Sequence, residues 1–175
     1  MSIRLPASAC VAALLFVAGP ALAQSSESSR PPAAVEFFAG YAGFADDATI
    51  DHSVFGGGGR VYVTPRLALG PELVYMRGPG SDRDFFLTGN LTFDVLSPQQ
   101  GRPRRVSPFL VAGGGFFRHS EQFGSTDFSS YEGAFTGGGG ARFWMNDRVY
   151  AVGDFRIGWE LHYRITGGIG ISMRR

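Results

Sequence analysis

Bulky apolar residues alternate with charged, glycine or hydroxylated residues along many segments of the chain. The alternation is clearest in Arg142–Trp144, Asp154–Ile157 and Arg164–Ser172. A period of two places the two kinds of side chain on opposite faces of a β-strand. No helical period occurs beyond the N-terminus, so the sequence offers no helices to cover the apolar faces. We therefore expect lipid to cover them and the polar faces to line the inside of a closed barrel.

The alternation predicts eight strands. Their expected ranges are 34–44, 53–64, 67–77, 85–96, 107–118, 131–144, 148–159 and 161–173. Each is long enough to cross a bilayer, which takes about 9–11 residues of a tilted strand. Eight is also the smallest usual number of strands in a membrane barrel. The predicted fold class is therefore all-β, an eight-stranded antiparallel up-and-down transmembrane β-barrel.

Short and long connections alternate between the predicted strands. Thr64–Leu67 and Asn146–Arg148 have the length of the tight turns found on the periplasmic side of such barrels. The longer polar connections on the other side are Ala45–Asp51, Gly78–Asp84 and His119–Ser130. Ser97–Arg105 breaks this alternation, because it is long although it lies on the periplasmic side.

Two predicted hairpins have similar sequences. Gly57–Glu72 recurs 82 residues later as Gly139–Asp154, an offset of four strands, so the hairpins should occupy corresponding places in two half-barrels. We expect odd-length turns centred on Arg66 and Arg148. The cross-strand ion pairs expected from this register are Arg60 with Glu72 and Arg142 with Asp154.

The polar parity of the strands gives the expected lining of the lumen. Its charged members are Glu36, Arg60, Glu72, Asp94, Arg118, Glu132, Arg142, Asp154, Arg156, Glu160 and Arg164. Because an eight-stranded interior is just wide enough to be filled by side chains, these charges should interlock as a plug. Small inward residues leave room for long arginines from neighbouring strands. The inward glycines are Gly56, Gly58, Gly138, Gly140, Gly168 and Gly170.

The opposite parity is apolar and should face lipid. Its members are Val35, Phe37, Tyr41, Val61, Leu69, Leu73, Phe85, Leu87, Leu91, Phe93, Phe135, Phe143, Phe155, Ile157, Ile165, Ile169 and Ile171. Aromatic residues near strand ends form girdles at the interfaces of membrane barrels. The residues expected in such girdles are Tyr41, Tyr75, Trp144, Tyr150, Trp159 and Tyr163.

The first 23 residues have the pattern of a cleaved secretory signal peptide. Arg4 precedes an apolar stretch from Ala7 to Ala18, and Ala21–Ala23 forms the cleavage site. The alternative, a membrane anchor, is disfavoured because the stretch is much shorter than the ~20 residues of a spanning helix. A second alternative is lipidation at Cys10. Residues 24–33 are expected to be a flexible leader, and residues 34–173 the barrel.

Removing 23 of the 175 residues leaves a mature chain of 152, the size of one domain. The mature chain keeps 15 basic and 15 acidic side chains and is formally neutral, which argues against a nucleic-acid partner. Every basic side chain is arginine, whose planar fork suits fixed pairs with carboxylates. Cys10 is the only cysteine, so the mature chain has no disulfide and no thiol chemistry.

Several motifs suggest ligands. Gly56–Gly59 and Gly137–Gly140 resemble phosphate-binding loops, but neither opens a helix or precedes a Gly-Lys-Ser/Thr motif. The histidines His52, His119 and His162 lack metal-ligand spacing. We therefore expect no cofactor and no metal ligand among them.

Acidic and basic clusters in the connections leave two interpretations open. The acidic residues Asp46, Asp47, Asp51, Asp82 and Asp84 are either solvated carboxylates or ligands for Ca²⁺ and cation-bound lipopolysaccharide. The basic residues Arg102, Arg104 and Arg105 either contact anionic lipid headgroups or keep that turn soluble.

The signal peptide, Val35–Tyr41, Ser107–Gly115 and the closing Gly167–Ile171 segment together resemble the small eight-stranded outer-membrane β-barrel proteins of diderm bacteria, the OmpA/OmpX-like group. The resemblance covers the mature chain through diffuse motifs. It implies export to the cell outer membrane, contact with outer-membrane lipids and lipopolysaccharide, and insertion by the barrel-assembly machinery. The chain departs from the group by ending Ser172–Arg175, without the common terminal aromatic residue.

The resemblance implies a structural or surface-interaction role for the barrel, without catalysis. A narrow pore is one alternative. The other is a lipid A-modifying enzyme, a deacylase or acyltransferase, because some barrels of this size are such enzymes and the deacylases use a His, a Ser and an acid. The candidates are His52-Ser53 and His119-Ser120-Glu121, but adjacent strand residues point to opposite faces. The oligomeric state is left open.

Overall fold

The computed structural model of the chain describes residues 33–45, 49–96, 103–123, 126–159 and 162–173. The predicted signal peptide, residues 1–23, lies outside the described residues and stays a prediction. The predicted leader lies outside them too, except that Ala33 is the first residue of a strand.

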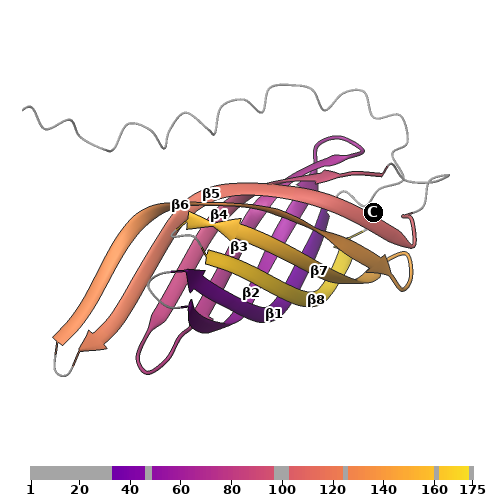
Figure 1. The fold of residues 1–175 in the computed structure, drawn as a ribbon. Helices are drawn as coiled ribbons and strands as arrows, with labels where there is room; N and C mark the ends of the chain where they lie inside the picture. The colour runs from indigo at the N-terminus through magenta and orange to yellow at the C-terminus, as the bar shows by residue number, and fades with distance from the viewer. Residues whose placement is uncertain (1–32, 46–48, 97–102, 124–125, 160–161, 174–175) are drawn as a thin grey trace, which may run out of the picture.

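The described residues form eight strands that close into one barrel, with every neighbouring pair antiparallel (Figure 1). The strands are β1 (Ala33–Ala45), β2 (Thr49–Tyr62), β3 (Leu67–Arg77), β4 (Arg83–Asp94), β5 (Val106–Phe123), β6 (Thr126–Trp144), β7 (Val149–Gly158) and β8 (His162–Met173). The barrel closes where β1 pairs with β8, from Ala33 opposite Met173 to Phe44 opposite His162. This architecture confirms the predicted fold class. The described segments contain no helix long and apolar enough to cross a membrane.

The two ends of the barrel differ in their connections. At one end, called the turn end below, the β2–β3 and β6–β7 connections are tight and have the same geometry. Val63 N–H donates to Leu67 O at 2.9 Å in the first turn, and Met145 N–H donates to Val149 O at 3.0 Å in the second. The tight turns and their equivalence in the two half-barrels were predicted correctly.

At the opposite end, called the hairpin end, β5 and β6 extend farther than the other strands (Figure 1). Their pairing continues to Phe123 opposite Thr126, so the predicted loop His119–Ser130 is wrong. The ladder is made by the backbone, so both strands continue it through a segment whose side chains are mostly polar. The predicted loop Ala45–Asp51 is also too long, because β2 begins at Thr49.

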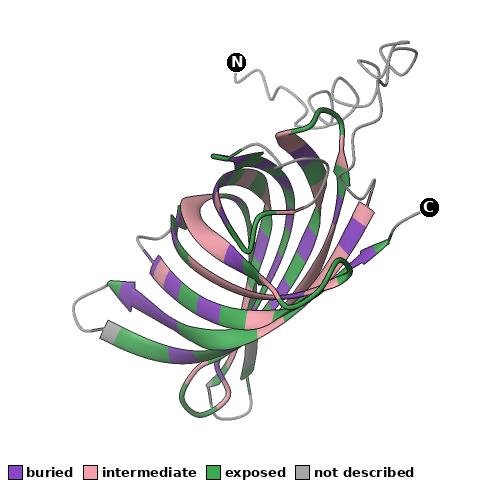
Figure 2. Cartoon of the chain, turned by 90° about the vertical axis from the view of Figure 1, so that its right-hand side faces the viewer, coloured by how far each residue is buried: buried purple, intermediate pink, exposed green. Residues whose placement is uncertain are grey.

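Burial follows the alternation. In β4, from Asp84 to Asp94, buried and exposed residues alternate at every position, and Figure 2 shows the same banding on other strands. All predicted lipid-facing residues are exposed large hydrophobics except Val35, which is half-buried. The outer wall of the barrel is therefore an apolar band.

The predicted register of the repeated hairpins is wrong by two residues. Glu72 lies opposite Gly58 rather than Arg60, and Asp154 lies opposite Gly140 rather than Arg142. Both turns are centred one residue earlier than expected. A slip of two residues leaves every side chain on its predicted face, so the alternation alone does not detect it.

Candidate functional site

The inward-facing side chains change character from the turn end to the hairpin end. Along β4, the inward residues run from Asp94 through Thr88 to Phe86 and then Asp84, all buried. Along β2, Arg60, Val54 and His52 repeat the order of charged, apolar and titratable side chains. From the turn end to the hairpin end, the lumen therefore contains charged layers, then an apolar layer, and then a second polar group at its mouth.

Four charged residues form the turn-end network: Glu36, Arg60, Asp94 and Arg142. The Arg142 guanidinium, 1% exposed, donates to Asp94 Oδ1 at 2.6 Å and to Glu36 Oε1 at 3.4 Å. Arg60 forms an ion pair with the same Glu36 carboxylate and donates to the Tyr150 hydroxyl. Two carboxylates thus face two guanidiniums that reach across the lumen.

The middle network consists of Glu72, Asp154, Arg156 and Arg164. Arg156 donates to both oxygens of Glu72, at 3.1 and 2.7 Å, and through Nε to Asp154 Oδ2 at 2.8 Å. Arg164 donates to Glu72 Oε1 at 2.8 Å. This network again balances two acids with two bases, and its bidentate fork is the strong form of an arginine–carboxylate pair.

An apolar layer fills the lumen between these networks and the hairpin end. It consists of Ala42, Phe44, Val54, Val74, Met76, Phe86, Phe117 and Ala134, with Phe38 packed against it. These residues lie on the inward parity, so the expectation of a polar interior is wrong for this layer. In an interior filled by side chains, apolar groups can pack against one another as in any protein core.

Three predicted lumen charges differ from the rest. Arg118 is exposed on the outer wall, with its guanidinium 5.3 Å from the Tyr131 ring centre, so its inward assignment is wrong. The β5 parity places Phe117 inside instead. Glu132 is exposed at the hairpin end and accepts a hydrogen bond from Trp159 Nε1 at 3.0 Å. Glu160 lies outside the described residues.

Two predicted girdle aromatics lie inside the barrel. Tyr150 is fully buried, and its ring packs against Trp144 with 4.5 Å between ring centres. Gly170 faces Tyr150 across β7 and β8, and a β-carbon there would overlap the tyrosine ring. The inward glycine therefore makes room for an aromatic ring rather than the expected arginine.

A cavity of about 920 Å³ opens at the hairpin end, above the apolar layer. Phe44 and Phe117 of that layer form part of its lining. Its polar lining residues are His52, Asp82, Asp84, His119, Glu121, Ser130 and Glu132. The cavity is thus a partly polar recess at the hairpin end of the barrel, above the apolar layer.

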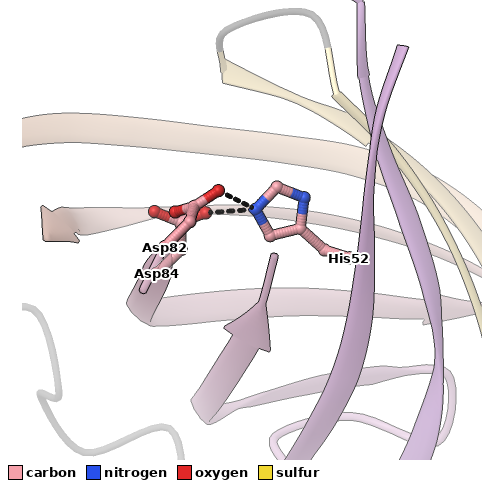
Figure 3. A group of neighbouring side chains, drawn as sticks. All are labelled: His52, Asp82 and Asp84. Atoms are coloured by element: carbon pink, nitrogen blue, oxygen red, sulfur yellow. Dashed lines mark hydrogen bonds and ion pairs between the residues drawn. The ribbon is translucent and has the colours of Figure 1, made fainter. Parts of the chain in front are cut away.

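Four of these residues converge and are called the mouth cluster: His52, Asp82, Asp84 and His119. Figure 3 shows the His52 ring of β2 directed at both carboxylates, with Nε2 lying 2.8 Å from Asp82 Oδ2 and 3.1 Å from Asp84 Oδ2. His119 Nδ1 on β5 lies 2.8 Å from Asp84 Oδ1 and 3.5 Å from Asp82 Oδ1. Three strands and the β3–β4 connection therefore meet at one point.

The electrostatics of the mouth cluster favour a cation. The outward residues Arg77 and Arg83 lie opposite each other at this level, one outward position beyond the exposed Phe85, at the edge of the apolar band. Burial opposes protonation of His52, but the hydrogen bond and charge of Asp84, with the charge of Asp82, outweigh it and raise the ring's pKa. Burial also opposes protonation of His119, and Asp84 again raises the pKa. Both rings therefore bind a proton more tightly than a free histidine does.

Sequence reasoning found only part of this group. Asp82 and Asp84 were left open as solvated carboxylates or Ca²⁺ ligands, and the histidines were dismissed for lack of metal-ligand spacing. The cluster joins residues 30 or more positions apart, which no local motif encodes. The cluster could have been found by aligning the strands in register, because His52 and Asp84 each lie on the inward face at the hairpin end of their strands.

The structure separates the residues of the proposed catalytic groups. Ser120 lies on the face opposite His119 and donates to the Arg83 carbonyl at 3.1 Å. Glu121 shares the face of His119, with its carboxylate 3.9 Å from Nε2. Ser53 and His52 likewise point to opposite faces of β2. Neither sequence candidate therefore assembles as a triad.

No protein-family model and no curated protein sequence matches the chain. Solved structures do match. Neisserial surface protein A (NspA) superposes with a TM-score of 0.70 at 11% identity, covering 81% of this chain and 97% of NspA. The N-terminal β-barrel domain of Pseudomonas aeruginosa OprF gives 0.61 at 13% identity, over 79% and 96%. Ail, the attachment invasion locus protein of Yersinia pestis, gives 0.57 at 11% identity, over 82% and 97%. The chain has the fold of the small eight-stranded outer-membrane β-barrels.

Proposed function

We propose that this chain is an integral outer-membrane β-barrel protein with a structural or surface-interaction role. The observation that carries the proposal is the band of exposed apolar side chains around a closed barrel. In water such a surface is a liability, whereas in a bilayer it is the required lipid contact. The shared fold with NspA, OprF and Ail supports the same environment.

The proposed lumen is closed rather than conducting. Two charge-balanced networks and the apolar layer lie in series along the barrel axis. A permeating ion would have to break paired guanidiniums and then cross a layer without polar partners. This arrangement favours a plugged barrel over the narrow pore considered as an alternative.

Lipopolysaccharide is the proposed partner of the outer wall at the hairpin end. Arg77 on β3 lies directly opposite Arg83 on β4, and Arg118 follows on β5. All three are on the outward parity, and like charges opposite each other repel. Lipid phosphates would relieve that repulsion, and on this proposal the hairpin end lies at the cell exterior and the tight turns lie in the periplasm. Export and insertion by the barrel-assembly machinery are parts of the same proposal.

The test of location is fractionation of cells expressing the full chain. The protein should enter the outer-membrane fraction and migrate faster on detergent gels when unboiled than when boiled. A matched variant, Leu91→Arg, places a charge on the lipid-facing wall and should lower the folded fraction. Recovery of the unchanged chain as a soluble periplasmic monomer contradicts the proposal.

The test of closure is planar-bilayer recording of the purified protein. A barrel closed by its own side chains should give no stable large-conductance openings. Steady openings of porin size would instead favour the pore.

Enzymatic lipid A modification is not favoured by the mouth geometry. Ser130 lines the same cavity as His119, but His119 has carboxylates on both sides, Asp84 at 2.8 Å and Glu121 at 3.9 Å. Both ring nitrogens therefore face carboxylates rather than the hydroxyl from which a general base would take a proton. Unchanged lipid A mass in cells overproducing the protein is the result expected.

A further inference from the structure

The mouth cluster leaves a buried oxygen without a hydrogen bond. Asp82 Oδ1 is shielded from solvent and accepts none, although its sister oxygen lies 2.8 Å from His52 Nε2. A buried carboxylate oxygen without a donor is costly. The unpartnered oxygen is directed into the cluster, 3.5 Å from His119 Nδ1.

The donor atoms of the cluster have the spacing of a metal site. Ligand atoms of His52, Asp82 and Asp84 all lie within 4.8 Å of one another, and all three residues are buried. Bonds of about 2.0–2.2 Å in a tetrahedron place neighbouring donor atoms roughly 3.3 Å apart. The His52 Nε2 atom lies 2.8 Å from Asp82 Oδ2 and 3.1 Å from Asp84 Oδ2, so these three donors need little movement.

The surroundings orient the histidines as metal ligands are oriented. His52 Nδ1 lies 3.2 Å from the Ile50 carbonyl oxygen. A carbonyl oxygen can only accept a hydrogen bond, so Nδ1 carries a hydrogen and donates it. The other nitrogen, Nε2, faces the two carboxylates and donates to them while it carries a proton. A metal ion would take the place of that proton on Nε2. Ligand histidines usually hold their second nitrogen in this way, on a backbone carbonyl or a carboxylate. The Glu121 carboxylate stands in the corresponding place for His119, 3.9 Å from Nε2.

We propose that the mouth cluster binds one divalent transition-metal ion of the Zn²⁺ class. One imidazole and two carboxylate donors, from His52, Asp82 and Asp84, form a mixed nitrogen and oxygen set. Imidazole suits zinc, copper and nickel, whereas calcium and magnesium take oxygen ligands. A metal ion in place of the Nε2 proton would bind the ring and both carboxylates, and it would also satisfy Asp82 Oδ1.

A glycine beside the cluster keeps the space open. Gly78 follows β3, and a β-carbon at this position would collide with Asp82 Oδ2 and His52 Nε2. Gly78→Ala therefore crowds the site without replacing any ligand residue. The cluster also lines the open cavity, so an ion can reach it from solvent.

Metal binding would link segments of the barrel rim that are not neighbours in the sheet. His52 belongs to β2, Asp82 to the β3–β4 connection and Asp84 to β4. One ion coordinated by all three joins β2 to β4, which the strand ladder connects only through β3. The β3–β4 connection should then become more rigid when the metal is bound.

The experiment measures Zn²⁺ binding by the full-length mature barrel in detergent, after chelator treatment and dialysis at about pH 8, above the ordinary pKa of histidine, so that fewer protons compete with the metal. Calorimetry should give one Zn²⁺ per chain. His52→Gln, Asp84→Asn and Gly78→Ala should each weaken binding by about 100-fold or more, since even partners of ligands account for about 10- to 100-fold. Asp51→Asn is the matched control, because it removes a neighbouring outward-facing charge. Its affinity should equal that of the unchanged chain.

The folded state of each variant is checked by the shift of unboiled samples on gels. X-ray absorption of the zinc-loaded, unchanged protein supplies a readout that needs no variant, and a first shell of mixed nitrogen and oxygen donors with four ligands supports the site. No uptake by the unchanged chain overturns the proposal, and so does a purely oxygen shell. Equal affinity of folded His52→Gln and Asp51→Asn overturns it as well.

Discussion

The lumen near the turn end and the lumen near the hairpin end lie on the same inward parity, yet they are filled by opposite chemistries. Near the turn end, Arg142 and Asp94 are buried as ions within a charge-balanced network. Near the hairpin end, Val54 and Met76 are buried as completely, among apolar neighbours. Parity therefore determines which side chains enter the barrel, but it does not determine their polarity.

The difference follows from how each half satisfies its buried groups. A guanidinium removed from water must keep its hydrogen bonds, so each arginine of the networks has carboxylates within reach. The apolar layer has no such demand and is stabilised by close packing. A substitution should therefore be costly where it leaves a charge unpaired or places a polar group in the apolar layer.

The largest effect is expected for Arg142→Ala. Its guanidinium contacts Asp94 and Glu36, and removing it leaves both carboxylates with less compensation in a dry interior. Breaking a buried pair in this way costs about 3–5 kcal/mol. Urea unfolding of the barrel in lipid vesicles measures this loss. Ile157→Leu on the outer wall is the control and should change stability by less than about 0.5 kcal/mol. Equal effects of the two substitutions would contradict a buried network.

A double-mutant cycle tests which residues are paired inside the barrel. Arg142 and Asp94 are in direct contact at 2.6 Å and should couple by about 0.5–3 kcal/mol. Asp154 instead contacts Arg156 and Thr166, so its effect should add to that of Arg142 within about 0.5 kcal/mol. The repeat in the sequence had suggested the opposite, a pair between Arg142 and Asp154. Strong coupling of those two residues would restore the sequence-based register.

A polar substitution in the apolar layer should destabilise the barrel more than an apolar substitution in the polar half. Val54→Thr places a hydroxyl in the apolar layer, where a buried group without a partner costs about 1–3 kcal/mol. Thr88→Val removes a hydroxyl whose hydrogen bond to Asn90 Oδ1 is long, 3.5 Å, and should change stability by less than about 1 kcal/mol. The same unfolding assay compares them. A larger loss for Thr88→Val would mean that the two halves do not differ as described.

The sequence predicted the number of strands, the tight turns and the outer face, because each of these depends on a local period. It could not predict which charges meet. Arg156 and Glu72 are 84 positions apart, and Arg142 and Glu36 are 106 apart. Such pairs depend on barrel shear and on side chains reaching across the lumen rather than on a neighbouring strand.

The apolar layer was missed for a related reason. In Phe85–Leu87 and Phe116-Phe117 both parities are apolar, and the alternation was used to assign one of them to lipid without asking what the other would pack against. The same gap explains Arg118. Its charge suggested the lumen, but the inward place belongs to Phe117. The mouth cluster needed the register of three strands at once, which single-sequence patterns do not supply.

The smallest effect on stability, and the most local, is expected for the outward arginines of the hairpin end. Arg83→Gln removes one charge from a row that we propose to contact lipopolysaccharide phosphates. A single basic residue near an anionic membrane surface contributes about 1 kcal/mol, which corresponds to about fivefold weaker binding. Fluorescence titration of the detergent-solubilised barrel with lipopolysaccharide measures the change, while its unfolding midpoint should stay nearly the same.

Arg148→Gln is the matched control at the turn end, where the exposed Arg148 lies in the tight β6–β7 turn. It removes the same charge from the opposite end of the barrel, so a contact confined to the hairpin end predicts unchanged affinity. Added salt should weaken binding of the unchanged chain more than that of Arg83→Gln, because the variant has one fewer screened contact. If both substitutions weakened binding equally, the attraction would come from total charge, and the assignment of the hairpin end to the lipopolysaccharide leaflet would lose its support.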